Sequence, residues 1–249
     1  RNMGVGASAS MSIVCDGALW GLVACHHRTA RPLSVDERTT ARLLAGALSQ
    51  QVARLDEAEL YRQRVRARNA EDELFALFAR YPDLDNEGIA RHAEGFLRVI
   101  PASGVALRRG DQLLVHGRAP AAADIHALCD FVASRDEDTV FVTDRLAEVY
   151  PPAAAFAALA SGIVAATAPE AEAQVVWFRP EQVEVVEWAG NPHKPVEPGA
   201  APGVLTPRKS FEVWRETVRG RSEPWSSVDA EAAARVARDR SIAFLREHV

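Results

Sequence analysis

The first thirty residues alternate in hydrophobicity in the way that a two-stranded hairpin requires. From Ala7 to Ile13 the serines occupy every second position, which is the two-residue period of a β-strand. Asp16-Gly17 marks a tight turn, and a second apolar run follows over residues 18–25. A domain does not normally begin with such a hairpin. We therefore expect residues 1–30 to be the end of a domain whose first part precedes them.

A long helical pattern follows this hairpin. Ser34 and Glu37 form a capping-box pattern after Pro32. No proline or glycine occurs over residues 47–81, and apolar residues recur at helical spacing at Leu44, Leu48, Val52 and Leu55. A helix of more than about 30 residues is roughly 50 Å long, so it is expected to connect domains, to line a dimer interface, or both. The arginines at 62, 64, 66 and 68 are interpreted as a solvated surface.

From residue 103 onward the pattern alternates between strands and helices. It predicts a hairpin over 105–115, a helix over 125–133, and strands over 140–143, 162–166 and 174–178. This order predicts an α+β domain with a central antiparallel sheet. A final helix is expected over 226–249, because Ser226 and Asp229 form a second capping-box pattern.

Residues 179–225 form an unusual segment. Its first leg, 182–188, alternates as a strand does, and a loop rich in proline and glycine follows. The second leg is ambiguous, since Phe211 and Val213 fit a strand, whereas Phe211, Trp214 and Val218 fit a helix. The segment is either a long surface hairpin or an element that exchanges two folds. Four of the five tryptophans lie at positions 177, 188, 214 and 225, which suggests that this arm packs on a partner surface.

Composition excludes several classes of protein. The 249 residues carry a net charge of −5 and a pI near 5.8 without a basic face, which argues against a nucleic-acid partner. Residues 153–168, the apolar part of the longest uncharged run, are too few for a membrane span, so no membrane contact is expected. Three cysteines are too few for a disulfide scaffold. These features favour a cytoplasmic protein.

Candidate chemistry on this chain is limited. Cys25-His26-His27 is the one metal candidate, but neighbouring residues of a strand point to opposite faces, so we expect no metal site. The sequence contains no phosphate-binding glycine loop and no Gly-x-Ser-x-Gly nucleophile motif. No catalytic residue is predicted, and the chain is not expected to be an enzyme.

Several motifs resemble those of one family, the bacterial phytochromes. Four motifs resemble the end of its chromophore-binding GAF domain: Asn2-Met-Gly-Val, Ser8-Ala-Ser10, Leu19-Trp-Gly-Leu and Ala24-Cys-His-His27. Four others resemble the tongue of its PHY domain: Trp177-Phe-Arg-Pro-Glu181, Trp188-Ala-Gly190, Pro207-Arg-Lys-Ser-Phe211 and Trp214-Arg-Glu216. The resemblance covers nearly the whole chain in the right order.

The resemblance implies a fold and a domain order. Residues 1–30 would be the last GAF strands, 31–81 the connecting helix, 82–225 a GAF/PAS-like PHY domain with its tongue at about 179–225, and 226–249 an output helix. The implied function is red/far-red light sensing as part of a bacteriophytochrome, relayed through the tongue and the long helices. The alternative is a sensory module of the same fold that binds another small ligand without photochemistry. The implied partners are the N-terminal PAS-GAF part of the same protein, an output domain and a second copy of the chain.

The resemblance also implies roles for individual residues toward a biliverdin chromophore. Ser8 and Ser10 would bind a propionate, and His26 would bind the carbonyl of ring D. The cysteine that attaches biliverdin lies outside this sequence, and none of the three cysteines here matches it. In the tongue, Arg208 would contact a GAF aspartate in the dark state and Ser210 would replace it after photoconversion. The tongue set comprises Trp188, Pro207, Arg208, Ser210, Phe211, Trp214 and Glu216.

This role requires Ser8, Ser10 and His26 to share one face of the hairpin. A two-residue loop without a bulge would separate them, whereas a three-residue loop at residues 15–17 pairs Ser8 with Ala24 and brings His26 to the serine face. We therefore predict the three-residue loop. In the tongue of a red-absorbing dark state, we expect 182–188 and 208–214 to pair as strands. In a far-red-absorbing state, we expect 207–219 to form a helix.

Overall fold

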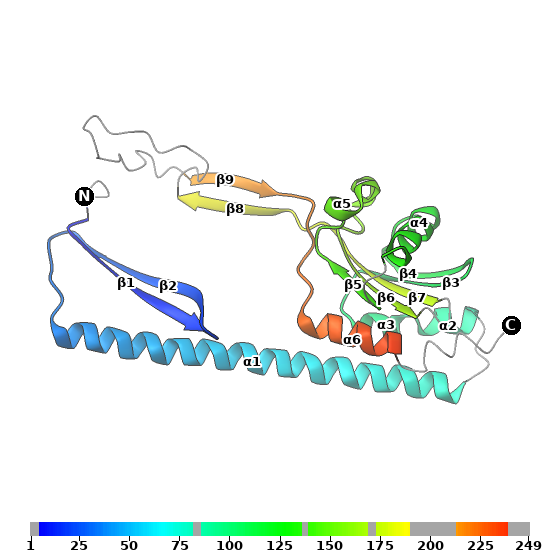
Figure 1. Ribbon diagram of the computed structural model, residues 1–249, viewed down its shortest axis with the longest axis horizontal. Coiled ribbons are helices and arrows are strands. Elements are labelled where there is room, and N and C mark those ends of the chain that lie inside the picture. Colours follow the sequence, from blue (N-terminus) through cyan, green and yellow to red (C-terminus); the bar gives the residue numbers. More distant parts are fainter. Residues whose placement is uncertain (1–4, 82–85, 136–138, 169–172, 190–212, 239–249) are drawn as a thin grey trace. The chain divides into compact units, whose positions relative to one another are not determined.

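The computed structural model describes residues 5–81, 86–135, 139–168, 173–189 and 213–238. The chain divides into two compact units (Figure 1). One comprises Arg1–Arg62 with Glu187–Trp214, and the other comprises Gln63–Val186 with Arg215–Val249. The described elements confirm the α+β class with an antiparallel sheet. No helix among these residues is long and apolar enough to cross a membrane.

The first unit contains the expected hairpin and the start of the long helix. Strand β1 (Ala7–Cys15) pairs antiparallel with β2 (Ala18–His27), and helix α1 runs over Val35–Arg80. The capping box is formed, since Ser34 N donates to Glu37 Oε2 at 2.8 Å and Glu37 N donates to Ser34 Oγ at 3.1 Å. The first of these bonds lowers the pKa of Glu37. The helix therefore starts where the sequence predicts.

The predicted three-residue loop of the hairpin is wrong. Cys15 pairs with Ala18, so the loop is the two-residue Asp16-Gly17 turn. Both loop residues have positive φ, 50° and 77°, as a type I′ turn requires and as the Asp-Gly pair favours. A bulge follows, because Val14 pairs with Leu19 but Ile13 pairs with Gly21. Trp20 is the extra residue, and it shifts the rest of the ladder by one position.

The second unit is built on a five-stranded antiparallel sheet of order β4-β3-β7-β6-β5. Its register places Val105, Trp177 and Val164 side by side across the three inner strands. The predicted hairpin and strands are confirmed. Their bounds are β3 Gly104–Arg109, β4 Gln112–Gly117, β5 Val140–Thr143, β6 Gly162–Ala168 and β7 Ala173–Arg179.

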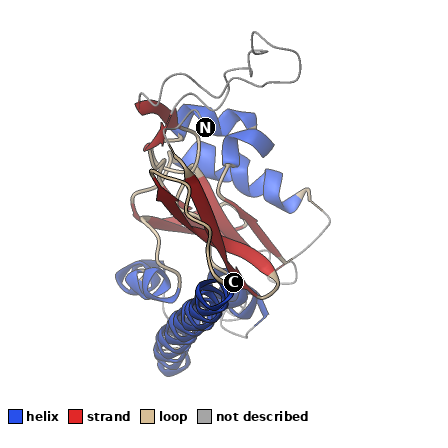
Figure 2. Ribbon diagram, turned by 90° about the vertical axis from the view of Figure 1, so that its left-hand side faces the viewer, coloured by secondary structure: helices blue, strands red, loops and turns tan. Residues whose placement is uncertain are grey.

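Helices cover both faces of this sheet (Figure 2). On one face, Ile125 and Leu128 of α4 (Ala122–Ala133) pack with Ile163, Val176 and Phe178. The short α5 (Leu146–Val149) and a 3₁₀ helix (Pro151–Phe156) complete that layer. The remaining helices are α2 (Asn86–His92), α3 (Glu94–Val99) and α6 (Ser227–Arg238). Of these six helices, the pattern predicts α4 and α6; the others are too short to show a period.

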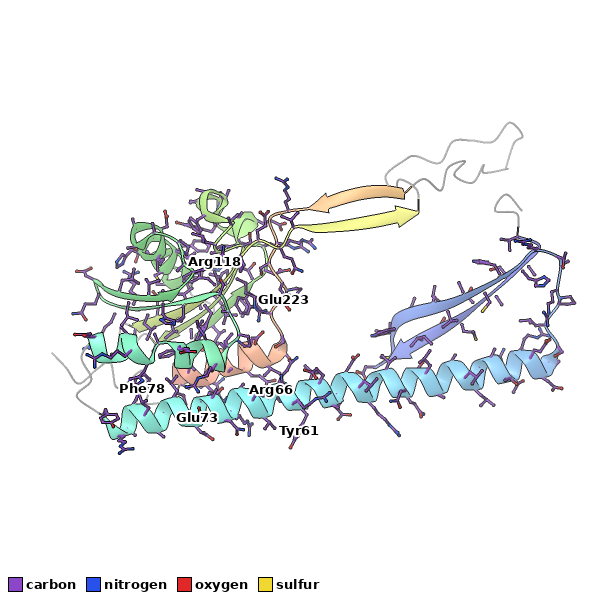
Figure 3. All side chains as sticks on the ribbon, turned by 180° about the vertical axis from the view of Figure 1, so that it is seen from behind. Tyr61, Arg66, Glu73, Phe78, Arg118 and Glu223 are labelled. Carbon is purple, nitrogen blue, oxygen red and sulfur yellow. The ribbon has the colours of Figure 1, made fainter. Side chains whose placement is uncertain are left out.

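Trp177 belongs to the core of this unit rather than to an arm on a partner surface. Its side chain is fully buried, and its indole Nε1 donates to Phe96 O at 2.9 Å. The centroid of the Phe96 ring lies 6.5 Å from that of Trp177 and 6.0 Å from that of Phe78. Phe78 is labelled on α1 in Figure 3. The prediction from the tryptophan positions is therefore wrong for this residue, because a central strand buried on both faces needs a large apolar side chain.

Candidate functional site

The hairpin brings the three predicted site residues of the first unit onto one face. Ser8 pairs directly with His26, and Ser10 pairs with Ala24. Paired residues of an antiparallel ladder project to the same side, so Ser8, Ser10 and His26 share a face. The bulge at Trp20 produces this result in place of the longer loop that the sequence predicts. The expected shared face is present, with a different register.

This face is open and partly apolar. Ser12 pairs with Leu22 on the same side as the other serines, and Leu22 is 59% exposed. Near the turn, Leu19 and Trp20 are also exposed. Large apolar side chains exposed beside hydroxyl groups and an imidazole indicate a surface that binds a ligand or another protein segment. Hydroxyl donors suit carboxylates, and an imidazole N–H suits a carbonyl.

The opposite face of the hairpin is covered only near the turn. Ile13 is 2% exposed there, whereas Val23, Cys25 and His27 on the same face are exposed. Val14 N donates to Ser49 Oγ at 3.1 Å, and Cys15 Sγ donates to Ser49 O at 3.6 Å. Ser49 Oγ in turn donates to Ala45 O within α1. The helix thus holds the bulged end of the hairpin and leaves the serine face open.

Strand alternation separates the two neighbouring histidines. His27 pairs with Ala7 on the other side of the ladder, and its Nδ1 lies 3.0 Å from Thr29 O. Cys25 shares that side, so the strand divides the candidate metal ligands between two faces. Among the described residues, no group of three histidine, cysteine or acidic side chains is placed to hold a metal ion. His26 is the histidine of the pair that faces the serines.

The tongue segment is a two-stranded ladder over the residues that the structure describes. Strand β8 (Glu184–Ala189) contains Trp188, and β9 (Val213–Val218) contains Trp214 and Glu216. The second leg is thus a strand, with described bounds that lie further along the chain than 208–214. The other members of the tongue set lie outside the described residues: Pro207, Arg208, Ser210 and Phe211.

The base of the tongue contains residues that sequence reasoning missed. Glu181 Oε1 accepts the N–H of Gly220 at 2.6 Å, and Gln182 N donates to Arg221 O at 2.8 Å. Arg179, the last residue of β7, contacts the segment that leads from β9 to α6. The signal for these residues was present, since Arg179 and Glu181 belong to the Trp-Phe-Arg-Pro-Glu motif. Their partners lie about forty residues away, which a local pattern does not reveal.

Two ion pairs join α6 to α1 within the second unit. Arg235 donates to both oxygens of Glu71 at 2.8 Å, and Arg64 donates to both oxygens of Glu231 at 3.0 and 3.2 Å. The hydrogen bonds to Glu71 raise the pKa of Arg235, and those from Arg64 lower the pKa of Glu231. The sequence predicts a solvated surface for Arg64, and its side chain is 43% exposed; the partner that α6 supplies to it is what the sequence does not reveal.

Comparison with protein families places both parts of the chain. The model of the GAF domain matches residues 1–52, which include the hairpin. The model described as the phytochrome region matches residues 67–247, which is more than half of the chain. The chain belongs to the phytochrome family.

Individual phytochromes are similar to this chain over most of its length. Cyanobacterial phytochrome A of Nostoc sp. is 36% identical over 235 residues, which are 94% of this chain and 30% of that protein. A bacteriophytochrome of Xanthomonas campestris pv. campestris is 31% identical over 240 residues, 93% of this chain and 38% of that protein. This phytochrome chain therefore spans about a third of the length of these relatives.

Solved phytochrome structures have the same fold. A bacteriophytochrome from the photosynthetic bacterium R. palustris matches with a TM-score of 0.76 and 36% identity, covering 98% of this chain and 49% of that one. The photosensory core module of the Stigmatella aurantiaca phytochrome matches with a TM-score of 0.70 and 37% identity, covering all of this chain and 50% of that one. The predicted family, a bacterial phytochrome with the end of a GAF domain followed by a PHY domain, is confirmed.

Proposed function

We propose that this phytochrome chain is part of a red/far-red light sensor, in which the hairpin contacts the chromophore and the tongue and long helices transmit the response. The observation that carries the proposal is the pairing of Ser8 with His26, which places two hydroxyl donors and an imidazole on one open, partly apolar face. The domain assignment is part of the proposal: GAF strands over 1–30, a connecting helix over 31–81, a PHY domain over 82–225 and an output helix over 226–249.

The donor set of this face fits a bilin, and we assign biliverdin to it. A bound bilin would supply the absorption of red light and a double bond that isomerises. The hydroxyls of Ser8 and Ser10 would donate to a propionate, and the imidazole of His26 would donate to the ring D carbonyl. A single neutral hydrogen bond at His26 is weak enough to break and re-form, which suits a contact that must change with light. The covalent attachment site is assigned to a part of the protein outside this sequence.

The tongue is the proposed second half of the switch. Its described legs are strands, which is the arrangement proposed for the red-absorbing dark state. Arg208 would hold a GAF aspartate in this state with its planar guanidinium, and Ser210 would take that place when residues 207–219 become helical. Trp188, Pro207, Phe211, Trp214 and Glu216 would complete the tongue. Sequence that supports both a strand and a helix keeps the two states close in free energy.

The proposed partners are a second copy of the chain, the PAS-GAF part of the same protein and a downstream output domain in the cytoplasm. Leucines on the first half of α1 support the second copy. Leu44, Leu48 and Leu55 are 63%, 43% and 56% exposed, and their spacing of four and seven residues places them along one side of the helix. Pairing of two such helices would bury these side chains.

The proposal predicts reversible photoconversion that depends on His26. In the complete protein loaded with biliverdin, red light should shift absorption from a red to a far-red band. His26→Ala should slow or destabilise the conversion by up to about tenfold, as expected for one lost hydrogen bond. His27→Ala is the matched control, since His27 faces the other side of the hairpin, and it should behave as the wild type does.

Absorption spectra before and after red illumination provide the measurement. A biliverdin-loaded wild type without a reversible band shift would contradict light sensing and would favour the alternative, a non-photochemical ligand-binding module. Equal effects of His26→Ala and His27→Ala would contradict the assignment of the serine face to the chromophore.

A second prediction concerns the tongue. Arg208→Ala should weaken the hairpin state and Ser210→Ala should weaken the helical state, because each removes the hydrogen bonds that hold one of the two folds. The dark-reversion rate of the photoconverted complete protein should therefore fall in Arg208→Ala and rise in Ser210→Ala. Lys209→Ala, between the two, serves as the control. Identical rates in all three variants and the wild type would show that neither side chain holds the switch.

A further inference from the structure

Arg179 joins its own strand to two segments that are distant in the sequence, one at Pro101 and one over residues 224–229. Its guanidinium donates to Pro101 O at 2.8 and 3.1 Å and to Pro224 O at 2.8 Å. The same group lies 3.4 Å from Asp229 Oδ2, and its Cζ lies 3.8 Å from the centroid of the Trp225 ring. Only 12% of its side chain is exposed. Only arginine combines a planar cation that stacks on an indole with several hydrogen-bond donors that point in different directions; lysine has neither property in this form.

The carboxylate that Arg179 contacts also begins the C-terminal helix. Asp229 Oδ2 accepts the N–H of Ser226 at 2.8 Å, and Asp229 N donates to Ser226 Oγ at 3.2 Å. This capping box starts α6, and Asp229 is 7% exposed. One carboxylate oxygen therefore serves both the ion pair with Arg179 and the cap. A displacement of Arg179 would therefore remove a contact of the Asp229 carboxylate, which caps the start of α6.

Both ends of the tongue meet at this residue. The chain leaves the sheet at Arg179, continues into β8, returns through β9, and reaches Trp225 before α6 begins. Figure 3 shows Glu223 in the segment between β9 and α6. The indole Nε1 of Trp225 donates to Thr143 O at 3.1 Å, so the ring that stacks on Arg179 is itself held by the edge strand β5. The contacts of Arg179 and Trp225 therefore lie where both tongue legs join the sheet and α6.

We propose that Arg179 is a positioning residue that couples the tongue to α6, so that refolding of the tongue shifts the capped start of this helix. The coupling rests on the proposed light-sensing function. α6 contacts α1 through the Glu71–Arg235 and Arg64–Glu231 pairs. In this proposal, a shift at the start of α6 acts on a helix that these ion pairs hold on α1. Refolding of the tongue is thereby passed to the long helix.

The test measures two properties of one variant: the spectral change of the chromophore and the hydrogen exchange of α6. Arg179→Lys keeps the positive charge but removes the fork and the stacking. In the biliverdin-loaded complete protein, its red/far-red spectral change should match that of the wild type. The difference between dark and illuminated hydrogen exchange at the amides of α6 should fall about tenfold. A purely structural role would raise exchange equally in the dark and in the light and would leave this difference intact.

A second variant and a control complete the design. Asp229→Asn keeps an oxygen for the cap but loses the ion pair, and it should reproduce the effect of Arg179→Lys. Arg98→Lys alters an exposed ion pair with Glu73 in the same unit and should have no effect. Normal photoconversion with a wild-type exchange difference in both Arg179→Lys and Asp229→Asn would overturn the coupling alone. Absence of photoconversion in the wild type would overturn the proposed function and the coupling with it.

Discussion

Replacement of Trp177 by alanine is expected to lower the free energy of unfolding of the second unit by about 3–5 kcal/mol. The side chain is fully buried at the centre of the five-stranded sheet, between Val105 and Val164 on the neighbouring strands. Its removal leaves a large cavity beneath Phe96, which the surrounding β-strands and helices fill only in part. It also removes the donor to Phe96 O. The loss is a large fraction of the stability of an ordinary domain.

Urea denaturation followed by circular dichroism measures this effect. Trp177→Phe should cost less than the alanine variant, because it keeps most of the ring volume and because Phe96 O still accepts the N–H of Ile100 at 3.1 Å. Trp20→Ala is the control of the same residue type, since Trp20 is 60% exposed in the hairpin, and it should leave the transition of the second unit unchanged. A Trp177→Ala transition at the wild-type urea concentration would show that this position is not in the core.

Replacement of Arg235 by leucine is the second large effect, with an expected loss of about 3–5 kcal/mol. Arg235 covers Glu71, whose side chain is only 5% exposed, with two hydrogen bonds of 2.8 Å. Without the guanidinium, the carboxylate of Glu71 stays buried without this partner, which costs far more than the attraction of an exposed pair. The double variant Glu71→Leu/Arg235→Leu should recover most of the loss, because it removes both charges together.

Arg64→Ala is the control for this experiment, because both members of the Arg64–Glu231 pair are more than 40% exposed and are screened by solvent. It should change stability much less than Arg235→Leu does. Equal losses in the two variants would mean that burial does not distinguish the pairs. The double variant also needs to be more stable than Arg235→Leu alone; a further loss would contradict the assignment of the cost to an uncompensated carboxylate.

The pKa shifts of the two pairs determine how their contributions depend on pH. The pKa of Arg235 is raised by its bonds to Glu71, so this contribution is lost only above the ordinary arginine range and stays constant near neutrality. The pKa of Glu231 is lowered by Arg64, so its contribution is present above the ordinary glutamate range and is lost as the pH falls through the lowered value. Acid therefore weakens the contact between α1 and α6, whereas base leaves it unchanged until the arginine range is reached.

The local elements of this phytochrome could be read from the sequence because each one depends on nearby residues. The capping boxes at Ser34 and Ser226 formed as predicted, since a cap involves residues only three positions apart. The alternation of Ser8 and Ser10, and the long helical period after Ser34, identified the hairpin and α1 for the same reason. The motifs of the hairpin and the tongue were sufficient to identify the family.

Tertiary structure decided the contacts between residues that are distant in the sequence. A period of two shows which side chains of a strand share a face, but not which residue of the neighbouring strand lies opposite. The bulge at Trp20 decides that Ser8 pairs with His26. The partner of Arg235 lies 164 residues away at Glu71, and Arg179 meets Asp229 across 50 residues. No local pattern encodes these pairs, because they form only when the sheet, α1 and α6 pack together and exclude water from the charges.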